Sequence, residues 1–207
     1  MSDFDVRTIP ATVHGRYLVR DGPSERLLIG FHGYGETAEA HLAELRQIPG
    51  IDRWTVVAVQ ALHPFYMNRT GMIVASWMTS LDRELAIDDN RDYVRSVVAQ
   101  FPPPQQLVFL GFSQGAAMAY RAAAGSNATG LIALGGDVPP DVVESRSNLP
   151  PVLIGRGIRE EWYTDEKLQK DLRFLREVTT VSTCVYDGAH EWTAEFREAA
   201  GEFLAQL

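Results

Sequence analysis

The chain has 207 residues with 27 acidic and 19 basic side chains, a formal net charge of −8, and 45% hydrophobic residues. We expect one domain over residues 1–207, and the acidic balance without a Lys/Arg cluster argues against binding to nucleic acid or anionic membranes. A single cysteine, no signal-peptide pattern and no apolar run of about 20 residues predict a cytoplasmic protein without membrane insertion.

Apolar runs of strand length alternate with helix-like segments along the chain. The predicted strands are 26–32, 54–60, 106–112, 130–136, 151–155 and 181–187. Several are continuously apolar, which is typical of strands buried on both faces. The predicted helices are 37–47, 88–100, 114–125, 164–178 and 192–206. This order predicts a mostly parallel sheet covered by helices, and alternation over 11–20 predicts an antiparallel edge strand.

The stretch "LGFSQG" (110–115) joins a predicted strand to an alanine-rich predicted helix. Ser113 lies at the junction with glycines two residues before and two residues after it. This is the pattern of a nucleophile elbow, in which small neighbours let the backbone double back around an exposed serine. The same turn puts the hydroxyl at a helix N-terminus, where developing negative charge is favoured. Ser113 is therefore the predicted nucleophile.

A serine hydroxyl needs a base, and the chain has five histidines. His190, in "DGAHEW", follows the last predicted strand and precedes the last helix. A loop at the carboxyl end of a parallel strand is where such a fold presents its base, so His190 is the predicted one. His32 ends an earlier strand, and we expect it to support the loop that follows.

A tetrahedral intermediate needs two N–H donors for its oxygen. One is expected from Gln114, the residue after the nucleophile. The segment "HGYG" (32–35) follows an earlier strand, and its glycines let the backbone approach a substrate. The backbone N–H of Tyr34 is the predicted second donor.

The motifs "LIGFHGYGE", the tryptophan in "ASWMTS", "LGFSQGAAMA" and "DGAHEW", in this order, resemble the phospholipase/carboxylesterase family that includes acyl-protein thioesterases. The resemblance implies an α/β-hydrolase fold: a mostly parallel sheet of about seven strands, helices on both faces, and little or no lid. It also implies a serine hydrolase for carboxylic esters or thioesters of small acyl substrates, with no metal and no organic cofactor.

The third triad member departs from the family pattern. The family resembles G-x-x-D after the strand that here is "PVLIG", and alignment on Gly157 puts Glu160 in place of the aspartate. A glutamate can orient the imidazole equally well if the loop retreats by about one methylene. Glu161 and Asp137 are the alternatives.

Substrate contacts are predicted from aromatic and methionine side chains near the motifs. The long segment 61–81 contains Met72 and Trp77, and its family counterpart makes Trp77 a candidate for lining the site. Trp162, Tyr163 and Trp192 flank the predicted acid and base and are candidates for an aromatic rim.

Two other functions stay open at this stage. One is a peptidase or lactone hydrolase of the same fold. The other is a binding protein without catalysis, for which the glutamate in place of the family aspartate is the only support.

Overall fold

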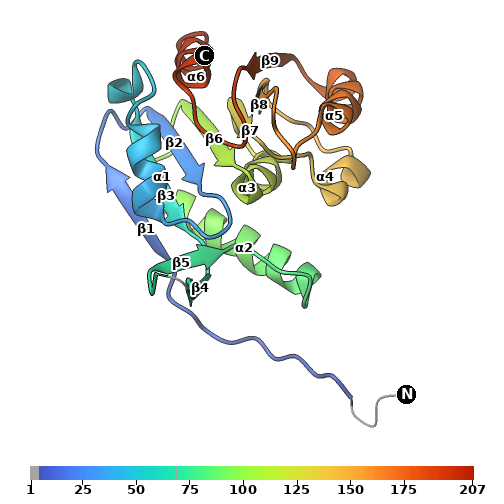
Figure 1. Cartoon of the computed structure of the whole chain (residues 1–207). Helices are drawn as coiled ribbons and strands as arrows, with labels where there is room; N and C mark the ends of the chain where they lie inside the picture. The colour runs from blue at the N-terminus through green and yellow to red at the C-terminus, as the bar shows by residue number, and fades with distance from the viewer. Residues whose placement is uncertain (1–4, 69) are drawn as a thin grey trace.

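A seven-stranded sheet runs through the middle of the molecule in a computed structural model that describes residues 5–68 and 70–207 (Figure 1). The strand order is β1-β3-β2-β6-β7-β8-β9. All neighbours are parallel except β1 and β3, which pair antiparallel at one edge. The strands are β1 (Arg16–Arg20), β2 (Arg26–Phe31), β3 (Thr55–Gln60), β6 (Gln106–Phe112), β7 (Gly130–Leu134), β8 (Val152–Gly157) and β9 (Val181–Tyr186).

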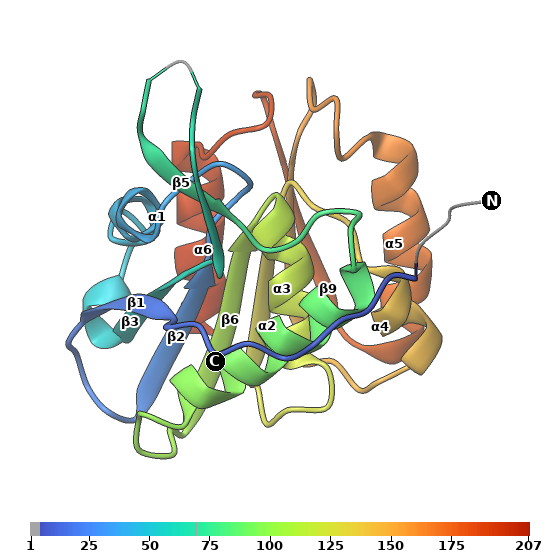
Figure 2. The ribbon, with the colours of Figure 1, turned by 90° about the horizontal axis from the view of Figure 1, so that it is seen from below.

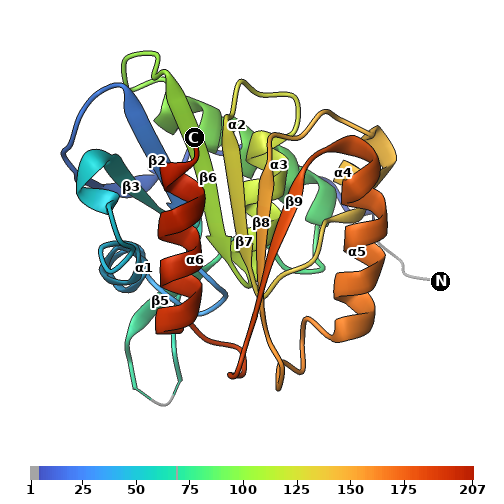
Figure 3. The same cartoon turned by 90° about the horizontal axis from the view of Figure 1, so that it is seen from above.

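The central strands are buried because both of their faces are covered by helices. One face packs against α2 (Arg83–Val98), α3 (Gln114–Ala123), α4 (Pro140–Ser145) and α5 (Asp165–Val178). The other packs against α1 (Ala38–Leu45) and α6 (Ala194–Ala205). Figure 2 shows α2 and α3 in front of the sheet, and Figure 3 shows α1 and α6 in front of its opposite face. The molecule therefore has the three layers predicted from the sequence.

The two cores are separated by the alternation of side chains along each strand. Leu27 and Ile29 of β2 face the α2–α3 side, whereas Leu28 faces the α1–α6 side. On the strand beside it, Phe109 of β6 shares the first core and Leu110 the second. This explains the continuous apolar runs, since each strand must supply a hydrophobic residue to both layers.

The segment between β3 and α2 contains a second, two-stranded sheet, which the sequence analysis did not predict. β4 (His63–Tyr66) and β5 (Ile73–Ser76) pair as an antiparallel hairpin. The hairpin is joined to the segment after β2 by two backbone bonds: Ala75 N–H donates to the Glu36 carbonyl, and Gly35 N–H donates to the Ala75 carbonyl. The 3₁₀ turn Ile51–Arg53 and helix α4 are also additions to the predicted elements.

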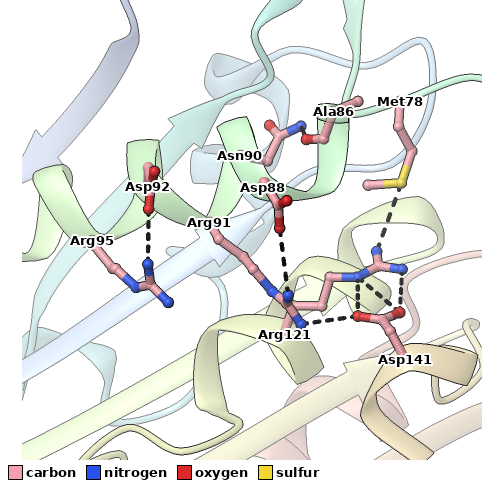
Figure 4. Close-up of polar contacts among 9 residues, drawn as sticks. All are labelled: Met78, Ala86, Asp88, Asn90, Arg91, Asp92, Arg95, Arg121 and Asp141. Carbon is pink, nitrogen blue, oxygen red and sulfur yellow. Dashed lines mark hydrogen bonds and ion pairs between the residues drawn. The ribbon is translucent and has the colours of Figure 1, made fainter. Parts of the chain in front are cut away.

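A buried arginine connects the helices on the α2–α3 side. The Arg121 side chain is 1% exposed, and its guanidinium donates to both carboxylate oxygens of Asp141, with Nη2–Oδ1 at 2.8 Å (Figure 4). Arg91 of α2 donates to the same carboxylate at 3.0 Å, and Arg121 Nη1 also lies 3.7 Å from Met78 Sδ. The contacts of Arg121 and Asp141 thus link α2, α3 and α4 to the segment that follows β5.

The predicted elements agree with the structure except at their ends. The antiparallel edge strand is shorter than expected, 16–20 in place of 11–20, and α2 starts at 83 rather than 88. None of the helices in the described ranges combines the length and the hydropathy needed to span a bilayer.

Candidate active site

The predicted site residues lie at the carboxyl ends of adjacent parallel strands. Ser113 follows β6, Glu160 follows β8 and His190 follows β9, and Gly135, which was not among the predicted residues, follows β7 between them. Because parallel strands end at the same edge, segments far apart in sequence meet there. Figure 2 shows the loops after β2, β8 and β9 gathered at the upper end of the sheet.

Ser113 occupies a strained backbone conformation between β6 and α3. Its φ is 54° and its ψ is −119°, and it precedes the first residue of the helix. An L-residue held in such a region costs about 1–3 kcal/mol, which the surrounding structure must offset. Its N–H donates to the Leu134 carbonyl at 2.8 Å, which ties the turn to the neighbouring strand.

Both glycines around Ser113 are required by close backbone contacts. A Cβ at Gly111 would lie 2.1 Å from the Gly115 carbonyl oxygen, the collision expected when the chain doubles back. A Cβ at Gly115 would lie 2.1 Å from the Phe31 carbonyl oxygen of β2. The second glycine therefore lets α3 start close to the strand that carries the segment "HGYG".

Glu160 is paired with His190. Glu160 Oε2 lies 2.5 Å from His190 Nδ1, and the glutamate side chain has no exposed surface. Its other oxygen, Oε1, accepts the backbone N–H groups of Trp162 at 2.8 Å and Tyr163 at 3.3 Å. This arrangement fixes the carboxylate and leaves His190 Nε2 as the nitrogen able to accept a proton.

The two alternative acids are placed differently. Glu161 is exposed, next to the buried Glu160. Asp137 is exposed and lies 3.7 Å from Lys167 Nζ. Within the part of the chain that the structure describes, neither forms an ion pair or hydrogen bond with His190.

His190 packs beside the nucleophile turn. Its ring centroid is 4.8 Å from that of Phe112, the residue before Ser113. A Cβ at Gly135 would be 3.1 Å from the imidazole and 3.4 Å from Glu160 Oε2, so the glycine leaves room for the pair. Over the described residues, Ser113 Oγ makes no hydrogen bond; bonds of this kind in ligand-free sites are often long and shorten when substrate binds.

The segment 32–36, named here the oxyanion loop after its predicted role, lies against Ser113. A Cβ at Gly33 would be 3.3 Å from Ser113 Cβ. Gly33 N–H donates to Glu36 Oε2 at 2.7 Å, and Gly35 N–H donates to the Ala75 carbonyl at 3.0 Å. Among the described residues, the Tyr34 N–H between them has no acceptor.

Glu36 was not singled out from the sequence, although its carboxylate is part of the loop. Burial raises its pKa, whereas the bond from Gly33 and the positive charge of His190 act in the opposite direction. The only signal in the sequence is an acid three residues after Gly33, a short spacing that many ordinary turns share. The bond from Gly33 engages that N–H within the loop, whereas the neighbouring Tyr34 N–H has no acceptor among the described residues.

His32 supports the oxyanion loop, as expected. Its ring is fully buried, Nδ1 lies 2.7 Å from the Gly33 carbonyl, and Nε2 accepts the Ala61 N–H at 3.0 Å. Nε2 must therefore be unprotonated and Nδ1 must carry the hydrogen. Burial lowers the pKa of this imidazole, which favours that neutral form.

A second contribution missed from the sequence is the side chain of Gln114. Its Oε1 accepts the Trp77 N–H at 2.9 Å, and its Nε2 donates to the Met78 carbonyl at 2.8 Å. Trp77 in turn donates its indole N–H to the His32 carbonyl at 2.8 Å. The residue after the nucleophile and the start of the oxyanion loop are thus held by one segment.

The expectation that Trp77 and Tyr163 line the substrate cleft is wrong. Trp77 is 0% exposed and Tyr163 is 1% exposed, and both belong to the core on the α2–α3 side. Side chains without exposed surface cannot contact a substrate, and their polar groups are used within the protein instead.

The other three predicted contact residues retain accessible surface. Trp162 is 73% exposed and Met72 is 58% exposed. Trp192 is half-buried and packs against Phe112 and Phe196. Within the described ranges, no group of three or more His, Cys, Asp or Glu side chains is placed to hold a metal ion.

The sequence model of the family described as "Phospholipase/Carboxylesterase" matches residues 18–207. The chain belongs to this family. Membership makes it a hydrolase of the carboxylesterase type. None of the curated proteins matches the sequence.

Solved structures agree with the family in fold. Esterase PE8 is 22% identical with a TM-score of 0.78, over 94% of this chain and 99% of that one. A phospholipase/carboxylesterase from Dyadobacter fermentans is 22% identical with a TM-score of 0.73, and the match covers 94% of this chain and 98% of that one. Zea mays acyl-protein thioesterase 2 is 16% identical with a TM-score of 0.72, and the match covers 93% of this chain and 99% of that one. At these identities the likeness establishes the α/β-hydrolase fold.

Proposed function

We propose that this member of the phospholipase/carboxylesterase family is a serine esterase that cleaves carboxylic esters or thioesters of small acyl substrates through an acyl-enzyme on Ser113. The observation that carries the proposal is the 2.5 Å contact between Glu160 and His190, with the carboxylate fully buried beside a strained serine turn. A buried acid of this kind orients the imidazole and stabilises its cation.

In the acylation step, Ser113 Oγ attacks the acyl carbon and His190 Nε2 takes the hydroxyl proton. The carbonyl oxygen becomes an oxyanion, which the N–H groups of Tyr34 and Gln114 stabilise. As the intermediate collapses, the bond to the leaving oxygen or sulfur breaks and the imidazolium gives its proton to the departing alcohol or thiol. Glu160 keeps its negative charge throughout and stabilises the cation.

In the deacylation step, His190 Nε2 takes a proton from water, which attacks the acyl carbon. A second tetrahedral oxyanion forms at the same two donors. Its collapse breaks the bond to Ser113 Oγ, returns the proton from His190 to that oxygen and releases the carboxylic acid. All proton transfers use groups of this chain and water, so the proposed cycle includes no metal and no organic cofactor.

The substrate class is inferred from the surface beside the oxyanion loop. The Tyr34 ring is 62% exposed and its centroid lies 5.5 Å from that of Phe65 in the hairpin. Met72 at the far end of the hairpin and Trp162 after Glu160 add exposed apolar surface. Such a rim offers apolar contact to an acyl group; that the acyl group is small is a prediction from the sequence. Location in the cytoplasm stays a prediction from the sequence.

A fluorophosphonate probe and an ester panel test the proposal. Wild-type protein should be labelled at Ser113 and should hydrolyse short p-nitrophenyl esters, and Ser113→Ala should lose both properties. His190→Ala should lose hydrolysis, whereas His63→Ala, a change in the exposed hairpin, serves as the matched histidine control. Absence of labelling in folded wild-type protein would favour a binding protein without catalysis.

A panel of esters, thioesters, amides and lactones separates the related enzymes. Hydrolysis of amides or lactones at rates above those of short esters would replace the esterase with a peptidase or lactone hydrolase. Activity confined to long acyl thioesters would contradict the small acyl substrate.

A further inference from the structure

The segment 158–164 after β8, named here the acid loop, holds Glu160 inside the protein while most of its other side chains face solvent. Ile158 is 55% exposed and Trp162 is 73% exposed. Tyr163 is 1% exposed and is the next buried residue after Glu160. Backbone bonds to Tyr186 and Gly188 hold the start of the loop, and the contacts of Tyr163 hold the part that follows Glu160.

Tyr163 is held at three points. Its N–H donates to Glu160 Oε1 at 3.3 Å, and its carbonyl accepts Nε of the buried Arg156 at 2.7 Å. Its hydroxyl donates to Asp171 Oδ2 at 3.0 Å. The hydroxyl bond ties the Tyr163 side chain to helix α5, to which the acid loop is also joined by the Thr164 cap and by the bond from Lys167 Nζ to the Trp162 carbonyl.

Asp171 is a buried carboxylate, 4% exposed, one and a half turns into α5. Its Oδ2 also accepts the N–H of Val138, in the segment that follows β7, at 3.0 Å. Over residues 5–68 and 70–207, no cation forms an ion pair with it. One oxygen thus joins α5, the acid loop and the segment after β7.

The surroundings of Asp171 leave it ionised at neutral pH. Burial raises its pKa to about 6, against the bonds from Val138 and Tyr163 and the charge of Lys170, while the charge of Asp137 adds to the increase. Tyr120 of α3 also lies in its field. Above this pKa the two hydrogen bonds to Oδ2 are charge-assisted and correspondingly strong.

We propose that Asp171 is a positioning residue for the catalytic acid and acts through Tyr163. The proposal rests on the proposed function, in which Glu160 orients His190. Without the hydroxyl anchor, the Tyr163 side chain is free to shift in its pocket and its N–H moves with it. Glu160 Oε1 then loses a donor, and Oε2 no longer holds Nδ1 of His190 in the orientation for proton transfer.

The test compares two phenol deletions in the same region. Tyr163→Phe removes the anchor and keeps both backbone contacts of the residue. Tyr120→Phe is the matched control, because within the described residues its buried hydroxyl has no hydrogen-bond partner. Rates are measured with a short p-nitrophenyl ester and divided by the concentration of sites that a fluorophosphonate probe labels.

We expect Tyr163→Phe to lower kcat roughly 10- to 100-fold, the effect of a small misplacement of a catalytic group, with KM within about twofold of wild type. The low-field proton resonance of His190 Nδ1–H should also shift. Tyr120→Phe should change neither the rate nor the resonance. Asp171→Ala should lower kcat as much as Tyr163→Phe does. Asp171→Asn keeps an acceptor oxygen and should retain most of the wild-type kcat.

Two outcomes separate this inference from the proposed function. If wild-type protein is active but Tyr163→Phe and Asp171→Ala keep kcat per labelled site within twofold of Tyr120→Phe, the positioning role is overturned, whatever the loss of stability. If the probe does not label wild-type protein and the protein does not hydrolyse esters, the proposed function itself is refuted. Should Asp171→Ala not fold, Tyr163→Phe still decides the question.

Discussion

A buried histidine makes the stability of this protein depend on pH in a predictable direction. His41 of α1 is 1% exposed, and in the described structure neither ring nitrogen has a hydrogen-bond partner. Its ring packs edge-on against Trp192, with centroids 5.8 Å apart. Burial is the main cause that lowers the pKa of His41 from 6.5 to about 3, and the nearby His32, which would repel a second proton, adds to it.

Proton binding determines whether acid raises or lowers the free energy of unfolding. Between the lowered pKa and 6.5, the unfolded chain binds a proton at His41 that the folded protein does not. Acid therefore favours unfolding, and the free energy of unfolding falls as the pH drops below 6.5, reaching its full loss below the folded pKa. Integration gives a loss of about 2 kcal/mol at pH 5, a large fraction of the 5–15 kcal/mol typical of a domain.

The variant His41→Leu removes the titration and keeps a side chain of similar size in a helix. At pH 8 we expect it to be at least as stable as wild type, because an unsatisfied buried polar group costs about 1–3 kcal/mol. Between pH 8 and pH 5 the difference between variant and wild type should grow by about 2 kcal/mol.

Urea unfolding followed by far-ultraviolet circular dichroism at pH 8, 7, 6 and 5 measures these free energies. The titrations of other groups, including His32, are shared by the two proteins and cancel in the difference. Parallel curves for wild type and His41→Leu over this range would refute a buried neutral imidazole at position 41.

Three further substitutions test the site and its support. Glu160→Gln should lower kcat by about 10³–10⁴, because the amide can stabilise the wrong imidazole tautomer; a loss below tenfold in steady-state kinetics would contradict the role of Glu160. Gly115→Ala puts a Cβ 2.1 Å from the Phe31 carbonyl oxygen, so chemical denaturation should show a loss of about 1–3 kcal/mol or more, and an unchanged midpoint would show that the turn adapts. Asp141→Ala leaves the Arg121 charge buried and should cost about 3 kcal/mol, the low end of the range for a broken buried pair, because the carboxylate side chain is 28% exposed. Burial raises the pKa of Asp141, but the bonds from Arg121 outweigh this effect, and the net pKa is lowered. The stabilisation by the Arg121–Asp141 pair is therefore present at neutral pH and should be lost in acid. Equal free energies of unfolding for wild type and Asp141→Ala at pH 7 would refute the contribution of the pair.

The order of elements was predictable from the sequence, and Ser113 and His190 could be proposed as nucleophile and base, because both depend on local patterns. Continuous apolar runs identify buried strands, and glycines at 111 and 115 identify a backbone too close to its neighbours for a side chain. The hairpin β4–β5 was not predicted, since its residues have no clear period and β5 also pairs with the oxyanion loop, which is distant in sequence.

The sequence by itself determined which residue types can perform the chemistry and at which strand ends they lie. The tertiary structure decided which carboxylate meets His190, because Glu160 and Glu161 are adjacent and differ only in the direction in which the acid loop turns them. It also decided that Trp77 and Tyr163 support the site from inside, and that Gln114 and Glu36 contribute side chains as well as backbone. The contacts of Glu160 with His190, of Trp77 with His32 and of Gln114 with Trp77 join residues 30 or more positions apart, and such contacts are set by packing across the sheet and not by local sequence.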